Sequence, residues 1–425
     1  MDLAIRHGHA YVDGRIERVD IGVHDGRITT LGSVPDADRI VDATDCLVLP
    51  GLVNAHTHAA MTLLRGYADD LPLQQWLEEH IWPVEAALEP ADIAAGARLA
   101  ALEMIRSGTT AFADMYFGMP EVADVVNETG LRALLGYGMI SAGKSDEAAQ
   151  AELETGIEFA QRYDGQANGR IRTMITPHAP YTCDDWMLEE AASAALDLDC
   201  PLHIHVSETK SEVDDMVASE GVRPVAYLDR LGCWEPHSYI AHGVHLEATD
   251  RTMLANRRVG VAHCPSANMK LAAGIAPIPE LIDTGVVVGL GTDGPASNNT
   301  LDLFTAMRHA ALVAKVRAED AAVVPATAAI DMATTGGASL LGLNSGRIAV
   351  GRPADFAILD LQAAHLTPTH DLRSHVVYAA SGADVVTTIV DGSVLMEDRN
   401  VTVLDEDAVM AEAESRAAAL VARAQ

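Results

Sequence analysis

Residues 50–60 read PGLVNAHTHAA and place two histidines, His56 and His58, one residue apart at the end of an apolar run. The run itself, CLVLPGLV from Cys46, has the composition of a buried strand. Residues i and i+2 of a strand point to the same side, so we expect both imidazoles to face one point. Because polar rings at the end of a buried strand need a partner, the pair is either half of a metal site or two ordinary turn residues, and its spacing alone does not decide between them.

Further apolar segments follow along the middle of the chain, and helical patterns separate most of them. Together with GLVNAH, the candidate strands are TTAFAD, LRALLGYG, IRTMITPH, PLHIHVSE, SYIAHG, VGVAHC and VVVGLGTD. The stretch ADIAAGARLAALEMIRSG has helical spacing and a glycine stop, and LDLFTAMRHAALVAKVRAED is similar. Eight strand–helix units predict an α/β fold with a (β/α)8 TIM-type barrel over residues 51–345.

The two ends of the chain have a different pattern. Residues 1–50 alternate apolar and polar residues around Asp-Gly turns, and residues 346–400 do the same. The last residues, DEDAVMAEAESRAAALVARAQ, have the pattern of an Ala-rich amphipathic helix. We therefore expect residues 1–50 and 346–425 to form one composite domain, a small β-sandwich built from both termini with a C-terminal helix.

The charge balance limits the partners. The chain has 425 residues, a formal net charge of -32 and few lysines, which are Lys144, Lys210, Lys270 and Lys315. Such a surface repels nucleic acid and anionic membranes, so we expect neither as a partner. A large excess of carboxylates is typical of adaptation to a salty cytoplasm, where salt screens their mutual repulsion. We therefore expect a halophilic source.

Cysteine usage and the N-terminus indicate the compartment. The five cysteines are scattered and form no CxxC pair, which favours reduced thiols inside a cell. The start, MDLAIRHGHA, lacks the pattern of a signal peptide, and no apolar run reaches the roughly 18 residues of a membrane span. We expect a cytoplasmic protein. Assembly into a homo-oligomer stays open, since no interface is legible in the sequence.

Metal-binding side chains close four of the candidate strands. Besides His56 and His58, they are His203, His205 and Glu208 at the fifth strand, His242 and His245 at the sixth, and Asp293 at the eighth. The carboxyl ends of barrel strands meet at one face, so we expect these groups to converge. Such a nitrogen- and oxygen-rich set suits Zn²⁺ or Fe²⁺ with one position open for water. His7 and His9 have the same spacing, but they lie in the β-rich start and are expected at the surface.

The motifs resemble those of the amidohydrolase superfamily over nearly the whole chain. LPGLVNAHTH is similar to its first-strand signature, and SGRIAVGRPADFAILD is similar to its C-terminal signature. PHAPYTC, HIHVSET, WPVE and the long run from AHCPSANMK to NNTLDLF are similar to the branch that deaminates 5'-methylthioadenosine and S-adenosylhomocysteine, a neighbour of the triazine hydrolases. The resemblance implies a metal-dependent hydrolytic deaminase of adenine nucleosides, which releases ammonia and an inosine analogue.

The resemblance also implies a role for each matching residue. The ligands of a single catalytic metal, with Zn²⁺ expected first and Fe²⁺ second, are His56, His58, His205 and Asp293. Glu208 matches the proton shuttle, and His242 matches the histidine that polarises the attacking water. The implied substrate contacts are Glu85 at the ribose hydroxyls, His178, the pocket aromatic Trp76, and Glu208 and Asp293 themselves. His203, His245 and His263 match no ligand, and we expect them to be structural, with His203 in a deeper layer below His205.

Other interpretations remain at this point. Glu208 could be a solvated residue at a helix start, Asp293 a turn residue, Glu85 a loop residue and Trp76 a packed one. The enzyme could instead act on a free aminated ring such as guanine, cytosine or a triazine. A non-catalytic scaffold is the third reading. Glu85 argues against a free base, which has no vicinal diol, and the full ligand set argues against a scaffold.

One departure bears on the substrate. Relatives that accept S-adenosylhomocysteine tend to have arginines after the third barrel strand, where they can meet the amino-acid carboxylate. Here that stretch is LLGYGMISAGKSDEAAQAELE, with Tyr137 and with Lys144 as its only cation. This favours a substrate without that carboxylate, and the preferred 5'-substituent stays open.

Overall fold

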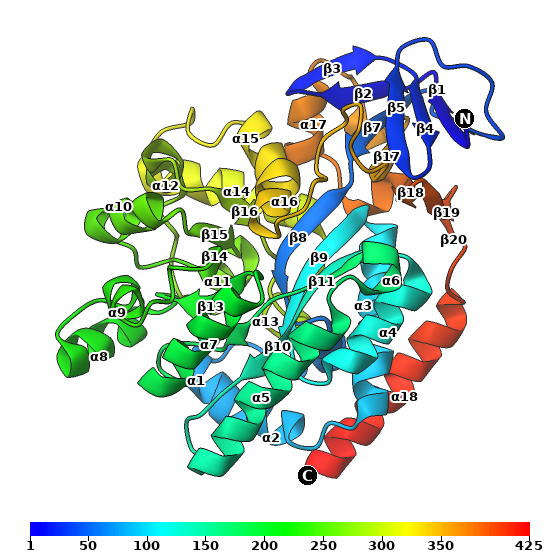
Figure 1. The fold of residues 1–425 in the computed structure, drawn as a ribbon. Helices are drawn as coiled ribbons and strands as arrows, with labels where there is room; N and C mark the ends of the chain where they lie inside the picture. Colours follow the sequence, from blue (N-terminus) through cyan, green and yellow to red (C-terminus); the bar gives the residue numbers. More distant parts are fainter.

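The middle of the chain alternates parallel strands and helices, as the sequence predicts (Figure 1). This computed structural model describes residues 1–425. The first sheet has the order β11-β10-β9-β8, with β12 beside β10; its strands are β8 (Leu52–Thr57), β9 (Thr109–Tyr116), β10 (Arg132–Met139), β11 (Ile171–Thr173) and β12 (Thr176–Pro177). The second has the order β13-β14-β15-β16, with β13 (Leu202–Val206), β14 (Ser238–His242), β15 (Gly260–His263) and β16 (Val288–Leu290).

Backbone contacts link these two parallel sheets on both sides. Ile175 forms a parallel bridge with Leu202, and the His203 amide donates to the Ile175 carbonyl at 3.0 Å. On the other side, the Asp293 amide donates to the His56 carbonyl at 3.0 Å. The fold is therefore α/β with parallel sheets, consistent with the predicted TIM-type barrel.

Helices lie between successive strands and cover them. They include α3 (Pro90–Arg106), α4 (Met119–Thr129), α5 (Asp146–Tyr163), α7 (Asp185–Asp197), α8 (Lys210–Glu220), α10 (Ala248–Arg257) and α14 (Leu303–Ala318). Helix α3 begins with a proline in its first turn and a capping box in which Glu89 and Asp92 satisfy each other's amides. Its buried face is rich in alanine, which lets it pack closely on the strands beneath.

Strands from both ends of the chain share one sheet. Its order is β20-β19-β18-β17-β7-β2-β3, with β2 (His9–Val12), β3 (Arg15–Arg18), β7 (Cys46–Pro50), β17 (Phe356–Asp360), β18 (Val385–Val390), β19 (Ser393–Glu397) and β20 (Asn400–Val401). A second sheet, β5-β4-β1-β6, contains β1 (Leu3–Arg6), β4 (Ile21–His24), β5 (Arg27–Leu31) and β6 (Arg39–Asp42). A separate apolar cluster joins residues of both sheets, including Ile5, Ile21, Phe356 and Ile389.

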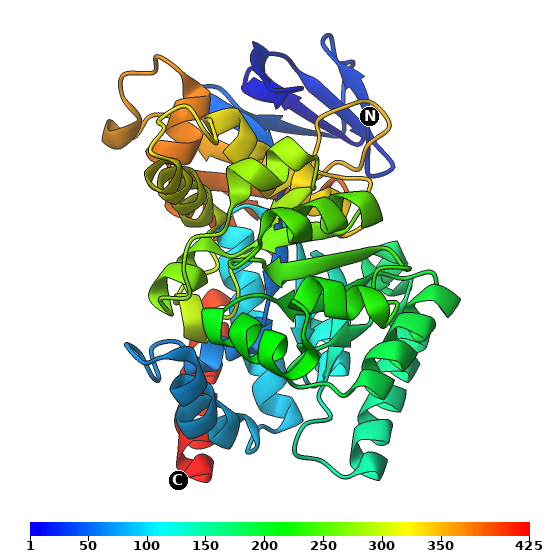
Figure 2. The ribbon, with the colours of Figure 1, turned by 90° about the vertical axis from the view of Figure 1, so that its left-hand side faces the viewer.

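The C-terminal helix α18 (Glu406–Ala424) runs away from these strands. It lies along α3 and ends near α2 (Trp82–Glu85), at the opposite end of the molecule from the N-terminus (Figures 1 and 2). Arg423 donates to the Ala87 carbonyl at 3.4 Å and pairs with the buried Asp92. The helix therefore contacts the long segment after β8 that covers one end of the strands.

That segment, residues 59–89, forms a cover that we call the lid. It contains a 3-10 turn (Ala59–Leu64), α1 (Leu73–Trp76), a π-helical turn (Leu77–Ile81) and α2. The sequence marks it as a long insertion after the first strand of the middle region, at the barrel end where loops carry function.

All five cysteines are buried and free of disulfides. No helix is long and apolar enough to cross a membrane.

Candidate active site

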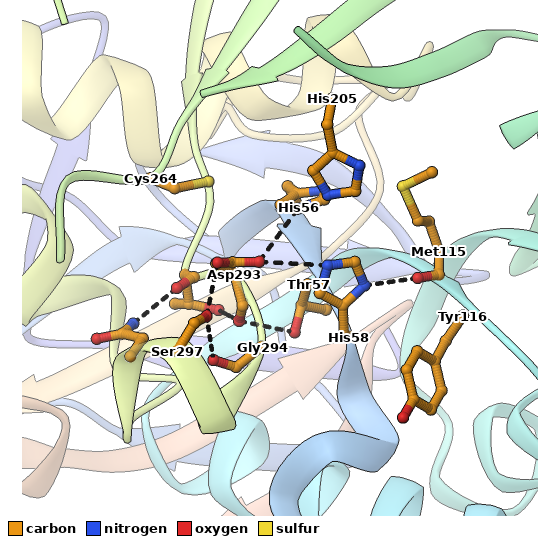
Figure 3. Close-up of polar contacts among 12 residues, drawn as sticks. His56, Thr57, His58, Met115, Tyr116, His205, Cys264, Asp293, Gly294 and Ser297 are labelled. Atoms are coloured by element: carbon orange, nitrogen blue, oxygen red, sulfur yellow. Dashed lines mark hydrogen bonds and ion pairs between the residues drawn. The ribbon is translucent and has the colours of Figure 1, made fainter. Parts of the chain in front are cut away.

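The carboxyl ends of the strands bring the expected metal-binding residues together. His56 and His58 come from β8, His205 from β13, and Asp293 follows β16. Asp293 Oδ1 lies 3.3 Å from Nε2 of both His56 and His58, so the carboxylate sits between the two imidazoles (Figure 3). The His-x-His spacing thus has the geometry expected of a strand, with both rings facing one point.

His242, at the end of β14, belongs to the same cluster. Ligand atoms of His56, His205, His242 and Asp293 all lie within 4.8 Å of one another. His58 belongs to the cluster through the contact of its Nε2 with Asp293, and its ring centroid is 4.8 Å from that of His56. The structure therefore gathers the four expected ligands and His242 around one point.

Backbone carbonyls orient two of the rings. Nδ1 of His58 donates to the Met115 carbonyl at 2.6 Å, and Nδ1 of His205 donates to the His178 carbonyl at 2.7 Å. A carbonyl can only accept, so in the neutral form of each ring the proton resides on Nδ1 and Nε2 presents a lone pair. His56 Nε2 is buried and makes no hydrogen bond. Three imidazole nitrogens and a carboxylate of this kind fit a divalent cation such as Zn²⁺.

Asp293 is held in an unusual conformation as an ionised group. Its φ of 64° lies in the left-handed region, as does the φ of 69° of His242. Ser297 donates to its Oδ2 at 2.6 Å. Burial disfavours charge on Asp293, but the imidazoles of His56 and His58, each 3.3 Å away, outweigh it and hold the pKa of this carboxyl well below its usual range. The left-handed backbone conformation of Asp293 and His242 is costly and persists only where the surroundings enforce it.

Glu208 is buried beside this cluster rather than solvated. Helix α8 begins two residues later with Thr209 as its N-cap, and the Glu208 amide donates to Glu212 at 2.8 Å. Oε1 of Glu208 lies 3.8 Å from His242 Nδ1. Burial raises the pKa of Glu208 above its ordinary value. The site therefore holds one carboxyl whose pKa is raised, Glu208, and one whose pKa is lowered, Asp293.

A pocket opens above the cluster. Its polar floor contains His58, His178, His205, Glu208, His242 and Asp293. Its walls are mostly apolar and include Met61, Leu73, Trp76, Leu77, Ile81, Trp82, Phe117, Ile140 and Leu271. No lysine or arginine lines it. The pocket therefore suits a mostly apolar ligand that presents polar atoms at its deep end.

Glu85 and Trp76 reach this pocket from the lid. The Tyr116 hydroxyl donates to Glu85 Oε1 at 2.5 Å, and burial raises the pKa of Glu85 to about 7. The Trp76 indole donates to the Ala68 carbonyl at 2.9 Å, and its ring is almost completely buried. His178 lines the pocket with Nδ1 2.8 Å from the Thr182 hydroxyl.

Several residues that support the site are not singled out by any pattern of the sequence analysis. They are Asp114, which accepts from the Ala59 amide at 2.9 Å; Tyr116, which bonds to Glu85; Asn268, whose Oδ1 is 2.9 Å from His242 Nδ1; and Glu212 and Ser297. Only Asp114 has a visible signal, because it closes the second candidate strand. His203 lies below His205, as expected, but it also bonds to His56 Nδ1 at 2.8 Å.

The remaining histidines stand apart from the site. His245 Nε2 lies 2.7 Å from the Ala273 carbonyl, and His263 is buried with neither ring nitrogen bonded. His7 is exposed beside Asp42. None of the three lines the pocket.

The chain belongs to the amidohydrolase family, whose model matches residues 47–395. It is similar to the 5-methylthioadenosine/S-adenosylhomocysteine deaminase of Natronomonas pharaonis, with 53% identity over 94% of this chain and 93% of that protein. It is 47% identical to the 5'-deoxyadenosine deaminase of Methanosarcina acetivorans, over 97% and 95% of the two chains. A solved adenosine deaminase from Xanthomonas campestris with bound zinc superposes with a TM-score of 0.94 at 38% identity, covering 99% of each chain.

Proposed function

We propose that this chain is a metal-dependent hydrolytic deaminase of adenine nucleosides, with 5'-methylthioadenosine, 5'-deoxyadenosine, adenosine and S-adenosylhomocysteine as candidate substrates. The observation that carries the proposal is the placement of two carboxyls with oppositely shifted pKa values, Asp293 and Glu208, beside the histidine cluster in one pocket. The names of the relatives described above support the same reaction.

The proposed metal ligands are His56, His58, His205 and Asp293, with Zn²⁺ favoured and Fe²⁺ as the alternative. The zinc in the similar solved structure supports this choice. When bound, the metal supplies a water acidic enough to be deprotonated near neutral pH. His242 stays outside the proposed ligand set because the resemblance to the deaminase branch assigns it to the attacking water; its Nδ1 lies 2.9 Å from Asn268 Oδ1 and 3.8 Å from Glu208 Oε1. We assign to it the polarisation of the attacking water.

The two carboxyl groups divide the proton transfers. Asp293, held ionised, accepts a proton from the attacking water. Neutral Glu208 donates a proton to the purine ring nitrogen beside the carbon that carries the amine, so the ring can hold the added electrons. The amine then takes the proton held by Asp293 and leaves as ammonia, while the hydroxyl proton passes to Glu208 and the carbon keeps the oxygen as a carbonyl. General acid–base help of this kind contributes about 10²–10⁴-fold to the rate.

The substrate side of the pocket favours a nucleoside with an apolar 5'-group. Glu85 offers a carboxylate to the two ribose hydroxyls, which a free guanine, cytosine or triazine lacks. No lysine or arginine lines the walls. Lys144, the only cation of its loop, pairs with Glu152, which also accepts from the Ile140 amide at 2.9 Å. The carboxylate of S-adenosylhomocysteine therefore finds no free cationic partner, which disfavours this substrate.

The finer features of the fold are also our inference. The backbone bonds between Ile175 and His203, and between His56 and Asp293, support closure of the eight strands into a (β/α)8 barrel over residues 51–345. The two sheets formed by the terminal strands support a β-sandwich of residues 1–50 and 346–425.

The proposed setting is the cytoplasm of a halophile. The net charge of -32 and the halophile relatives support it. The partner is a small-molecule nucleoside, not nucleic acid or a membrane, and a homo-oligomer is compatible with this function.

Glu85→Ala tests the nucleoside assignment directly. We expect a large loss of turnover on 5'-methylthioadenosine and no activity on free guanine or cytosine in either protein. A wild-type chain that deaminates a free base, with Glu85→Ala equally active on it, would instead identify an amidohydrolase of free aminated rings.

A further inference from the structure

We propose that His203 is a positioning residue that fixes the proton of His56 on Nδ1 and thereby sets the affinity of the site for its metal. The inference rests on the metal site of the proposed function. It assigns to His203 a role that its place below the ligand layer does not suggest.

His203 is held rigidly between two neighbours. It lies on β13, two residues before His205, and is the register partner of Tyr239 on β14. Its side chain is completely buried. Its ring stacks on that of Tyr239 with centroids 3.9 Å apart and an interplanar angle of 17°. The imidazole therefore has one orientation, and both of its nitrogens meet a partner.

His203 donates one hydrogen bond through Nδ1 and accepts the other through Nε2. Its Nδ1 lies 3.0 Å from the Tyr239 carbonyl, and its Nε2 lies 2.8 Å from His56 Nδ1. The carbonyl can only accept, so the proton of neutral His203 resides on Nδ1 and its Nε2 accepts. The proton shared with His56 is then carried by His56 Nδ1. His56 Nε2, which has no hydrogen-bond partner, is left with a lone pair that faces the cluster.

The opposite tautomer of His56 is a real competitor in this site. Asp293 Oδ1 lies 3.3 Å from His56 Nε2 and would accept a proton placed there. A proton on Nε2 would occupy the position of the metal. In the completely buried environment of His56, no other hydrogen-bond partner holds the proton on Nδ1. His203 therefore shifts this balance toward the form that can bind a cation.

His56 differs in this respect from the other proposed histidine ligands. His58 and His205 are oriented by the carbonyls of Met115 and His178. His56 alone depends on another side chain. The orientation of this one ligand is consequently open to mutation, and outer partners of this kind typically contribute 10–100-fold to metal affinity.

The test compares two amides of different reach at position 203. A glutamine places its terminal oxygen near the position of Nε2, where it can accept from His56, whereas an asparagine reaches only the position of Nδ1. We expect His203→Asn to raise the dissociation constant for Zn²⁺, measured by competition with a chelator, by about 10–100-fold. His203→Gln should remain closer to the wild-type value.

His263→Asn provides the matched control, because His263 is equally buried on β15 but neither of its ring nitrogens makes a hydrogen bond. Its Zn²⁺ affinity should equal that of the wild type. The melting temperatures of the metal-free proteins show whether a substitution impairs folding. The rise in melting temperature on adding Zn²⁺ reports metal affinity, and the inference predicts a smaller rise in His203→Asn alone.

The outcomes are distinct. Weakened Zn²⁺ binding in His203→Asn, rescued by His203→Gln and absent in the control, supports the inference. Equal affinity of all four proteins overturns it and leaves the proposed function intact, as does an equal loss in the asparagine and glutamine variants. A wild-type chain without stoichiometric Zn²⁺ binding overturns the proposed function and this inference together.

Discussion

The hydroxyl of Tyr116 donates a 2.5 Å hydrogen bond to Oε1 of Glu85, which ties the lid to the end of strand β9. Both side chains line the pocket. The bond leaves the second carboxylate oxygen of Glu85 without a hydrogen bond from the protein, so this oxygen is available to a ligand. A residue from a strand end thus orients the lid residue to which we assign the ribose.

Tyr116→Phe should therefore weaken nucleoside binding more than catalysis. Removal of this bond costs about 1 kcal/mol, so KM for 5'-methylthioadenosine should rise roughly 5-fold while kcat changes little. Steady-state kinetics checks this. Tyr163→Phe, on α5 and outside the pocket, should leave KM unchanged. A fall in kcat at constant KM would contradict the positioning role of Tyr116.

Glu208→Gln should separate metal binding from chemistry. The amide keeps the shape of the side chain but cannot transfer the proton that the purine ring needs, so kcat should fall by about 10²–10⁴-fold. Metal content, measured on the purified variant, should stay at the wild-type level because Glu208 is not among the proposed ligands. Near-normal turnover with full metal content would remove Glu208 from its assigned role.

The absence of lysine and arginine from the pocket lining predicts a preference among the nucleosides. Because the amino-acid group of S-adenosylhomocysteine would enter a pocket without a lysine or arginine, kcat/KM should be higher for 5'-methylthioadenosine. Parallel measurement of the two substrates checks this order. Equal or reversed values would show that another group, such as Lys144 released from Glu152, meets the carboxylate.

Arg132 should stabilise the join between the strands of the middle region and the terminal strands. It is buried on β10, 3.3 Å from Asp355 and 3.0 Å from Asp391. Arg132→Met leaves the buried Asp355 without its cationic partner and should lower the free energy of unfolding by about 3–5 kcal/mol. Arg172→Met, which breaks a more exposed pair with Asp164, should cost only about 0–1 kcal/mol. Denaturant titration of both variants in high salt measures the difference, and equal losses would contradict it.

Local patterns account for much of the fold and of the site. The parallel strands appear where apolar runs predict them, and the helices in ADIAAGARLAALEMIRSG and LDLFTAMRHAALVAKVRAED are confirmed as α3 and α14. The convergence of His56, His205 and Asp293 follows because each closes such a run. Strand periodicity and the direction of parallel strands are enough for this inference.

Contacts between distant segments could not be predicted in the same way. The bond of His203 to His56 spans 147 positions, and that of Asn268 to His242 depends on where α11 (Pro265–Lys270) lies after β15. The packing of α18 along α3 depends on tertiary contacts, because its alanine-rich face would fit several surfaces. These features depend on three-dimensional placement, which periodicity does not encode.

The central claim is that the chain deaminates adenine nucleosides, and ammonia release tests it most directly. The measurement uses the Zn²⁺-loaded wild-type protein in high salt, with 5'-methylthioadenosine, 5'-deoxyadenosine, adenosine, S-adenosylhomocysteine, guanine and cytosine as separate substrates. The account predicts stoichiometric ammonia and the inosine analogue from the adenine nucleosides, and none from the free bases. Full metal occupancy with no ammonia from any adenine nucleoside would contradict it.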